Sequence, residues 1–335
     1  MSRFPKRLVL LVIAAVAVFV VGCGEVKNAD GTSKSSTPAA QTAGGSEPTN
    51  LTIAMVTHSD EGSFWSVVKK GAEAAAKSEG VKLIWSPSDN DPQKEAQLIQ
   101  AAVSQKVDGL AVSVPNADAI KGALKQATDA GIPIITLNSG ADKSKELGAI
   151  THVGQDEVVA GRAAGQRLKD EGAKKVLCII HEQSNVGLAQ RCQGVKEGFG
   201  AAVTDLQVKG TADIATTQTE IKSKLQADKS YDAVMALNPD IAEAAKTAIK
   251  GAGSSAKLAT FDQSGPVMKD IQAGTISFAV DQQQYLQGYL PIVFLKLYKT
   301  NLNTVGGGQP VLTGPGFVDK TNAAQIEKLA EAGTR

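Results

Sequence analysis

The 335-residue sequence has few of the residues that build metal centres and nucleic-acid surfaces. It contains 3 Cys and 3 His, which are too few and too scattered for a zinc module. Lys and Arg number 35 against 34 Asp and Glu, and this balance offers no basic surface to nucleic acid. Hydrophobic residues make up 42% and charged residues 21%, which excludes disorder over most of the length. We therefore expect no metal, no cofactor and no nucleic-acid partner, in a chain long enough for two domains.

The apolar run at 8–21 is too short to cross a membrane comfortably. It has fourteen residues, whereas a spanning helix needs about 20. Because it follows a basic stretch with Arg3, Lys6 and Arg7, it is typical of a signal peptide. The run ends at Gly22-Cys23, which resembles the bacterial lipobox, where a small residue precedes a lipidated Cys. The alternative is an ordinary signal peptide followed by an incidental Cys.

We predict a lipoprotein signal peptide over 1–22 and lipidation at Cys23. Acyl chains on Cys23 would anchor the protein at the cell membrane, on the outer face of the cytoplasmic membrane. Residues 24–50 contain one branched aliphatic residue, Val26, and no aromatic residue, so they cannot bury enough apolar area to offset their ordering entropy. We therefore interpret 23–50 as the lipid anchor and a flexible tether.

From residue 51 onward, short apolar runs typical of strands alternate with longer amphipathic runs typical of helices. Repeated β-α-β units require parallel strands with right-handed crossovers. The alternation pauses at 139–154 and then restarts, which gives two sets of about five strands. We predict strands over 51–57, 81–85, 109–114, 132–137, 175–180, 205–209, 232–237, 257–261 and 276–281. We predict helices over 63–80, 93–105, 118–130, 156–170, 186–200, 217–227, 240–250, 265–273, 283–299 and 322–332. Pro291 interrupts the long helix at 283–299 and predicts a kink or an early start there.

This pattern predicts an α/β fold of two doubly wound, parallel-sheet (Rossmann-like) lobes. The N-terminal lobe would comprise 51–154 plus 283–312, and the C-terminal lobe 155–282 plus 313–335. A three-segment hinge would join them, with passages near 152–157, 280–283 and 310–315.

Ligands of open α/β sheets bind outside the carboxyl ends of the strands, so the loops that follow strands are the candidate site. These loops are rich in Asn, Asp, Gln, Ser and aromatic residues, which can hydrogen-bond hydroxyl groups in both directions and supply an apolar floor. They lie at 58–64, 115–116, 138–139, 181–185, 238–240, 262–264 and 282. No G-x-S-x-G, H-E-x-x-H or Walker motif is present, so we predict a binding protein rather than an enzyme.

Over 51–335 the sequence resembles the ribose-binding group of periplasmic sugar-binding proteins, the type I solute receptors of ABC importers. Four segments carry the resemblance in the family's order and spacing: the one beginning TIAMVTHSDEGSFW, then IPIITLNS, LAQRCQGVKEGF, and ALNPD with TFDQS and VDQQQYLQG. The resemblance implies capture of a small sugar or sugar alcohol between the lobes and its delivery to an ABC permease and its ATPase. We expect a monomer that acts beside the membrane.

Residue by residue, the resemblance implies eight ligand-binding positions. Asp262 would accept hydroxyl protons and Arg191 would donate in a fork geometry, which suits a vicinal diol. The implied residues are His58, Phe64, Trp65, Asn138, Arg191, Asn238, Asp262 and Gln282.

This sequence departs from the family pattern at three places. Asn138-Ser139 replaces a frequent Asp-Arg, Gly62 replaces Asn, and 213–217 lacks a second aromatic residue. Trp65 would fill the apolar floor of the binding site, and no second aromatic ring would face it across the ligand. We therefore favour a pentose, tetritol or pentitol over a hexopyranose as the ligand. A receptor for a furanosyl autoinducer-type signal, or a surface-anchored enzyme of similar fold, remains as an alternative.

Several of these residues also have structural explanations. Of the adjacent Phe64 and Trp65, we expect one to stack on the ligand and the other to pack in the core. Arg191 has an alternative role in a salt bridge with Asp213 or Glu197. His58 can instead be a loop histidine whose hydrogen bonds are satisfied within the protein. Asn238 and Asp262 can each cap the helix that follows them, and the group His181, Glu182 and Asn185 can cap the next helix.

Cys178 and Cys192 are the two cysteines beyond the lipobox, on a predicted strand and the helix that follows it. Export permits a disulfide, and strand–helix packing allows the necessary approach of about 7 Å between Cα atoms. We favour a disulfide between them over two buried thiols.

Overall fold

The computed structural model describes residues 50–200 and 202–335. The predicted signal peptide, Cys23 and the tether up to residue 49 lie outside the described residues. Within them, no helix is long and apolar enough to cross a membrane.

The first six-stranded sheet has the order β11-β5-β4-β3-β1-β2, and all its pairings are parallel. Its strands are β1 (Thr52–Thr57), β2 (Lys82–Pro87), β3 (Gly109–Ser113), β4 (Ile134–Asn138), β5 (Thr151–Gly154) and β11 (Val311–Leu312). The helices along this part of the chain are α1 (Gly62–Glu79), α2 (Pro92–Ser104), α3 (Ala117–Asp129), the 3₁₀ turn η1 (Ala141–Lys143), α9 (Gln284–Asn301) and η3 (Gly306–Gly308). We call this sheet and these helices the first lobe.

The second six-stranded sheet has the order β12-β10-β9-β8-β6-β7. Its strands are β6 (Val176–Ile180), β7 (Val203–Gln207), β8 (Ala233–Ala236), β9 (Lys257–Phe261), β10 (Ile276–Asp281) and β12 (Gly316–Val318). The helices along this part are α4 (Glu157–Asp170), α5 (Val186–Phe199), η2 (Thr211–Asp213), α6 (Ile214–Ala227), α7 (Pro239–Ala252), α8 (Gly265–Ala273) and α10 (Ala323–Glu331). We call this sheet and these helices the second lobe.

The predicted α/β fold with two doubly wound lobes is confirmed, and every strand expected from the sequence is present. The interpretation of 139–154 as a pause is wrong at its end, where Thr151–Gly154 forms β5. This strand escapes the apolar pattern because Thr151 and His152 are polar and nevertheless buried. The expectation of wholly parallel sheets is wrong for β12, which runs antiparallel to β10. The chain enters β12 from the other sheet, so no crossover helix imposes a parallel direction.

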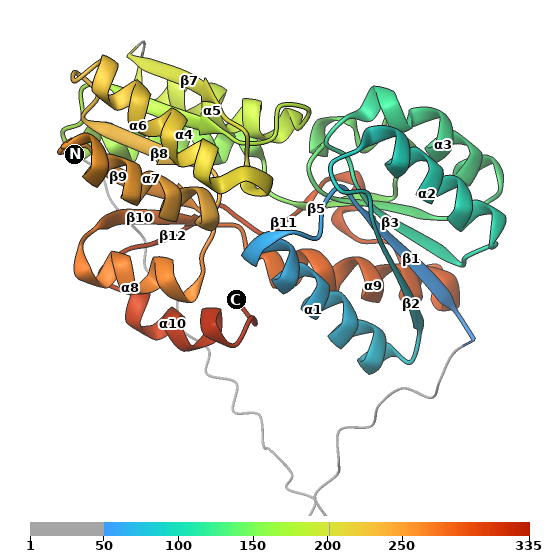
Figure 1. Cartoon of the computed structure of the whole chain (residues 1–335). Coiled ribbons are helices and arrows are strands. Elements are labelled where there is room, and N and C mark those ends of the chain that lie inside the picture. Colours follow the sequence, from blue (N-terminus) through green and yellow to red (C-terminus); the bar gives the residue numbers. More distant parts are fainter. Residues whose placement is uncertain (1–49, 201) are drawn as a thin grey trace, which may run out of the picture. The chain divides into compact units, whose positions relative to one another are not determined.

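Each sheet is covered on both faces by helices, which explains its continuous apolar strands. In the first lobe, α1 and α9 bury one face with Ile53 and Met55, while α2 and α3 bury the other with Ala54 and Val56. In the second lobe, α4 and α5 cover one face, and α6, α7, α8 and α10 cover the other (Figure 1).

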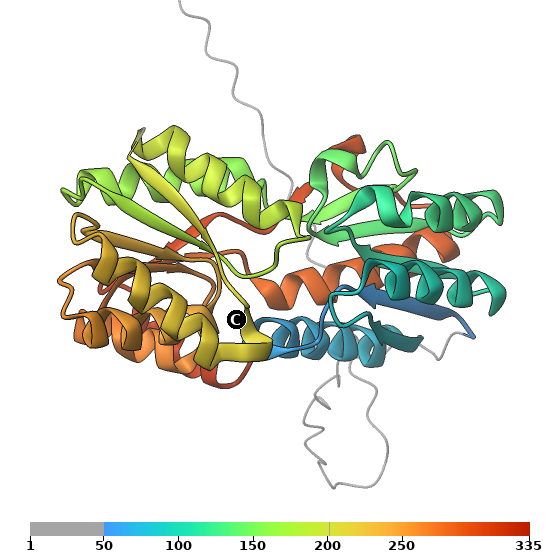
Figure 2. The same ribbon diagram turned by 45° about the horizontal axis from the view of Figure 1, so that its top comes forward.

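Helices α1 and α9 are far apart in sequence but lie side by side, as the blue and orange helices of Figure 2 show. A Cβ atom on Gly71 would meet the backbone oxygen of Tyr285 at 2.1 Å, and one on Gly288 would meet that of Val68 at 1.8 Å. Only glycine allows this approach of two helix backbones. Helix α9 runs from Gln284 to Asn301 with Pro291 inside it, so the interruption predicted at Pro291 is wrong, while a kink there stays a prediction.

The chain passes between the two sheets three times. It leaves β5 at Gly154 and enters α4 at Glu157, leaves β10 at Asp281 and enters α9 at Gln284, and leaves β11 at Leu312 and enters β12 at Gly316. These short passages coincide with the segments that the sequence suggests as a hinge.

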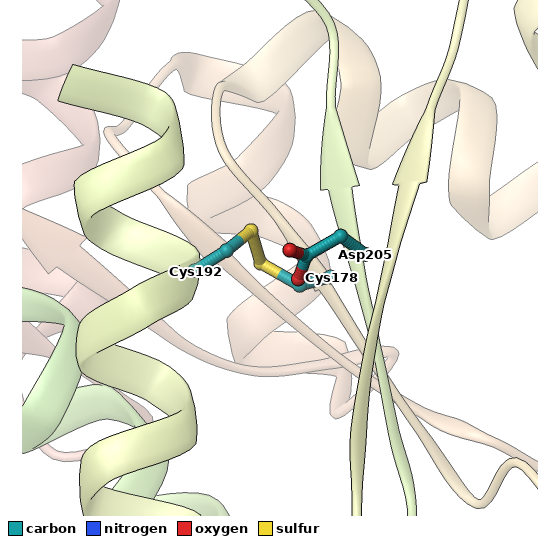
Figure 3. A group of neighbouring side chains, drawn as sticks. All are labelled: Cys178, Cys192 and Asp205. Atoms are coloured by element: carbon teal, nitrogen blue, oxygen red, sulfur yellow. A yellow bond between two sulfur atoms is a disulfide. The ribbon is translucent and has the colours of Figure 1, made fainter. Parts of the chain in front are cut away.

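Cys178 on β6 and Cys192 on α5 form a disulfide, with their Cα atoms 6.0 Å apart (Figure 3). The carboxylate of Asp205 on β7 lies beside the two sulfur atoms. Because the sulfur atoms are bonded to each other, they are not thiolate ligands, and this group is no metal site. The disulfide instead fastens α5, the helix that carries Arg191, to its sheet.

Glu95 on α2 is fully buried, and neither of its carboxylate oxygens has a hydrogen-bond partner. Burial alone raises the pKa of Glu95 to about 8. The folded protein therefore holds this proton up to about pH 8, whereas the unfolded chain releases it near the ordinary value of 4.5. Folding stability falls as the pH rises through this window, because the folded state binds the extra proton.

Glu95→Gln should remove this pH dependence. We expect the variant to gain stability over the parent between pH 5 and pH 9, by on the order of 4 kcal/mol at the upper end. Thermal unfolding across this range measures the difference, with Glu73→Gln on the exposed surface of α1 as the control. Parallel pH profiles for the parent and Glu95→Gln would show that Glu95 ionises normally.

Candidate functional site

A cleft between the two lobes holds about 430 Å³ of empty space, including the part open to solvent. Only about 40 Å³ of it is cavity that the centre of a water molecule can reach, so the lining side chains lie close together. All eight residues that the sequence suggests as ligand-binding line this one cleft, namely His58, Phe64, Trp65, Asn138, Arg191, Asn238, Asp262 and Gln282. That they contact a ligand stays a prediction.

Strand ends position most of these side chains. His58 follows β1, Asp262 follows β9 and Gln282 follows β10, while Asn138 is the last residue of β4. Parallel strands present their carboxyl ends at one edge of a sheet, so these polar residues converge at the cleft. Asn138 and Asp262 have positive φ angles of 61° and 65°, a conformation that Asn and Asp tolerate better than most residues.

Phe64 and Trp65 occupy the first turn of α1, and both line the cleft. Their rings meet edge to face with centroids 5.2 Å apart, and Trp65 makes a second edge contact with the His58 ring at 4.8 Å. Both side chains also belong to the apolar core of the first lobe. Both rings therefore line the cleft and pack in the core, and the expectation that one of them stacks on a ligand stays a prediction.

The predicted alternative partners of Arg191, Asp213 and Glu197, are wrong. The Arg191 guanidinium instead donates two hydrogen bonds to Glu157, from Nε to Oε2 at 2.6 Å and from Nη2 to Oε1 at 2.9 Å. Its Nη1 donates to the backbone oxygen of Leu237 at 3.1 Å. Arg191 and Glu157 are both buried, so neither charge is left to water.

Asp213 and Glu197 are occupied elsewhere: Asp213 caps α6, and Glu197 pairs with Arg162 on the surface. Removal of Arg191 would leave the Glu157 carboxylate buried without its charge partner. A substitution of Arg191 would therefore test folding as much as binding.

Asp262 supplies a carboxylate to the lining of the cleft. Its Oδ1 accepts a hydrogen bond from Gln282 Nε2 at 2.7 Å, and its Oδ2 lies 3.9 Å from Arg191 Nη1. Burial raises the pKa of Asp262 to about 7, against the opposing influence of the Arg191 charge and the Gln282 hydrogen bond. Asp262 is not a helix cap, because Ser264 caps α8. The carboxylate oxygen can accept from one hydroxyl group of a diol, while the neighbouring guanidinium N–H donates to the adjacent hydroxyl group.

Asn238 combines two roles. Its Oδ1 accepts from the backbone N–H of Ile241 at 2.8 Å and so caps α7, as the sequence suggests. Its Nδ2 therefore faces His181 Nε2 at 3.2 Å, which makes that ring nitrogen an acceptor. Burial lowers the pKa of His181 to about 4. The neutral ring then carries its proton on Nδ1, which is buried and has no partner among the described residues.

The loop between β6 and α5 reaches across the cleft to the first lobe. Glu182 Oε2 lies 3.6 Å from His58 Nε2, and Asn185 Oδ1 accepts from Ser139 Oγ at 3.1 Å. The backbone N–H of Val186 donates to the Pro115 carbonyl at 3.1 Å. His181, Glu182 and Asn185 also line the cleft, and Asn185 caps α5 as well.

Gly62 brings a further part of the first lobe close to the second. It has a φ of 78°, and a Cβ atom there would lie 2.4 Å from Asp240 Oδ2. That carboxylate accepts from the backbone N–H of Ser63 at 3.3 Å. The absence of a side chain at Gly62, a departure from the family pattern, is thus what allows this contact between the lobes.

Several residues of the cleft and of its supporting hydrogen bonds were not found from the sequence. Glu157 appears there only as an acidic residue at the start of a helix, a position that ordinarily complements the helix dipole. Gln287 on α9 accepts from Asn138 Nδ2 at 3.3 Å and donates to Gln282 Oε1 at 2.8 Å, so it links two predicted residues. Thr211 and Leu188 also line the cleft, with no distinguishing pattern in the sequence.

Comparison with known proteins gives three results. Residues 53–301 match the family described as the periplasmic binding protein domain. A carbohydrate transporter protein of Acidothermus cellulolyticus, solved in complex with myo-inositol, is 49% identical; the match covers 86% of this chain and all of that one, with a TM-score of 0.84. Ribose import binding proteins of Bacillus subtilis and Haemophilus influenzae are 31% and 27% identical over 68% and 72% of this chain, and over 74% and 83% of their own lengths.

Proposed function

Because this chain belongs to the periplasmic binding protein domain family, we propose that it is the solute-binding protein of an ABC importer. It captures a small sugar or sugar alcohol in the cleft between its lobes and delivers it to the membrane permease. It is a binding protein and not an enzyme, and no catalytic residue is assigned.

The observation that carries this proposal is the polar lining of a small cleft by both lobes. Asp262 and Glu182 offer acceptors, Arg191 Nη1 offers a donor, and the Phe64 and Trp65 rings provide apolar surface. A compound with several hydroxyl groups can donate to the first set and accept from the second. Such a compound also satisfies buried polar groups that are costly to leave unpaired.

Two ligand classes follow from separate observations. The fuller floor at Trp65 and the lack of an aromatic residue at 213–217 favour a pentose, tetritol or pentitol. The relative that is 49% identical binds myo-inositol, which favours a cyclitol of similar polarity. Both classes present the vicinal diols that suit Arg191 and Asp262.

A panel of pentoses, hexoses, tetritols, pentitols and inositols should contain a compound that raises the melting temperature, because a ligand of the folded state stabilises it. Asp262→Asn should then weaken that ligand by about 2–5 kcal/mol in calorimetry, since it replaces the acceptor carboxylate of a desolvated site. Asp129→Asn, at an exposed position on α3, provides a matched control that should bind like the parent. A panel without any stabilising compound, or full affinity in Asp262→Asn, would contradict the proposal.

We also propose that the protein is a lipoprotein held on the outer face of the cytoplasmic membrane and acts as a monomer beside its permease. The apolar run at 8–21 and the Gly22-Cys23 pair support the anchor. Cys23→Ala should move the protein from the membrane fraction to the soluble fraction, or leave its signal peptide uncleaved. A variant that stays in the membrane fraction with a normally trimmed N-terminus would refute lipidation at Cys23.

A further inference from the structure

Acidic side chains outnumber basic ones around the cleft. Glu61, Glu182 and Asp262 line it, whereas Arg191 is the only Lys or Arg side chain among the described residues that do. The Arg191 charge is already matched by its two hydrogen bonds to Glu157, which lies behind it. The lining therefore presents an excess of negative charge to whatever binds there.

Glu182 is the acidic residue of the cleft that faces both histidines, with its Oε2 3.6 Å from His58 Nε2. Its Oε2 accepts from Asn185 Nδ2 at 2.7 Å, and its Oε1 lies 4.0 Å from His181 Nε2. The Glu182 side chain is only 15% exposed. Burial raises its pKa, but the hydrogen bond and charge of His58 and the other neighbours outweigh burial and lower the pKa of Glu182 to about 2. Glu182 is thus a carboxylate at neutral pH.

Neither neighbouring histidine neutralises the cleft. His181 is uncharged at neutral pH because burial lowers its pKa to about 4. His58, which also packs against Trp65 and hydrogen-bonds Ser113, would balance only the Glu182 carboxylate when protonated. Glu61 would remain, together with the ionised fraction of Asp262, whose pKa burial raises to about 7. A cation in the ligand would complete this balance.

We propose that the cleft binds an amino-substituted polyol, an amino sugar or aminocyclitol, with its ammonium group against Glu182. This inference rests on the proposed function, since the hydroxyl groups of such a compound use Asp262 and Arg191. An ammonium group donates three hydrogen bonds and gains from a nearby carboxylate in a poorly hydrated site. A phosphorylated or carboxylated sugar would meet the same carboxylates as a like charge and be rejected.

Calorimetry at pH 7 with matched pairs of probes tests this assignment. The pairs are scyllo-inositol with scyllo-inosamine, D-glucose with D-glucosamine, and D-glucitol with 1-amino-1-deoxy-D-glucitol, and myo-inositol 1-phosphate and D-glucuronate serve as anionic probes. In the parent protein, at least one amino compound should bind about tenfold or more tightly than its neutral counterpart, and neither anion should bind. The comparison among probes needs no variant and does not depend on how a variant folds.

Glu182→Gln keeps an acceptor for Asn185 but removes the charge, so it should abolish the preference for the amino member. Glu73→Gln makes the same change on the exposed surface of α1 and should retain the preference. Failure of every amino compound to bind, or a preference that survives Glu182→Gln, would overturn the inference. If neutral polyols bind while amino compounds do not, the proposed function stands; if no polyol binds, neutral or amino, both proposals fail.

Discussion

The whole site depends on one topological constraint: parallel strands all end at the same edge of their sheet. In this chain two such edges meet, so residues separated by more than a hundred positions, such as His58 and Asp262, line one cleft. The apolar strands and the helices on both faces hold these edges in place. The loops at these edges can then carry polar groups that line the cleft, while Phe64 and Trp65 line it from the first turn of α1 and also belong to the core.

Ion pairs and hydrogen bonds between side chains then orient the residues that the strand topology brings to the cleft. The buried ion pair between Arg191 and Glu157 fixes the guanidinium and balances its charge with two hydrogen bonds. In the proposed function Arg191 therefore acts as a hydroxyl donor and not as a free cation. Gln282 and Gln287 connect Asp262 to Asn138 through successive side-chain hydrogen bonds, and Gln282 lies at a passage between the lobes. A ligand that engages Asp262 therefore acts on a network that already spans both lobes. Such a ligand favours the arrangement with the two lobes together over one with them apart only because it binds the first more tightly.

The sequence predicts the alternating helices and strands well because their apolar periodicity is a local property. The same periodicity shows where each strand ends, so the residues that follow the strands locate the cleft. It does not predict β5, whose polar Thr151 and His152 are buried through tertiary contacts, or the antiparallel β12, which pairs with a strand far along the chain. The partner of Arg191 was also missed. Glu157 lies on a different helix, and the close approach of α4 and α5 that brings the two together has no signature in the charge pattern.

The central claim is that a ligand bridges the two lobes and draws them together. Small-angle X-ray scattering, with and without a saturating polyol identified by the stability screen, measures this directly. The account predicts a smaller radius of gyration with the ligand, a liganded profile that matches the present arrangement of the lobes, and no change for Asp262→Asn under the same conditions. An unchanged profile for the parent protein at saturation would show that the lobes do not close on the ligand, and would contradict the claim.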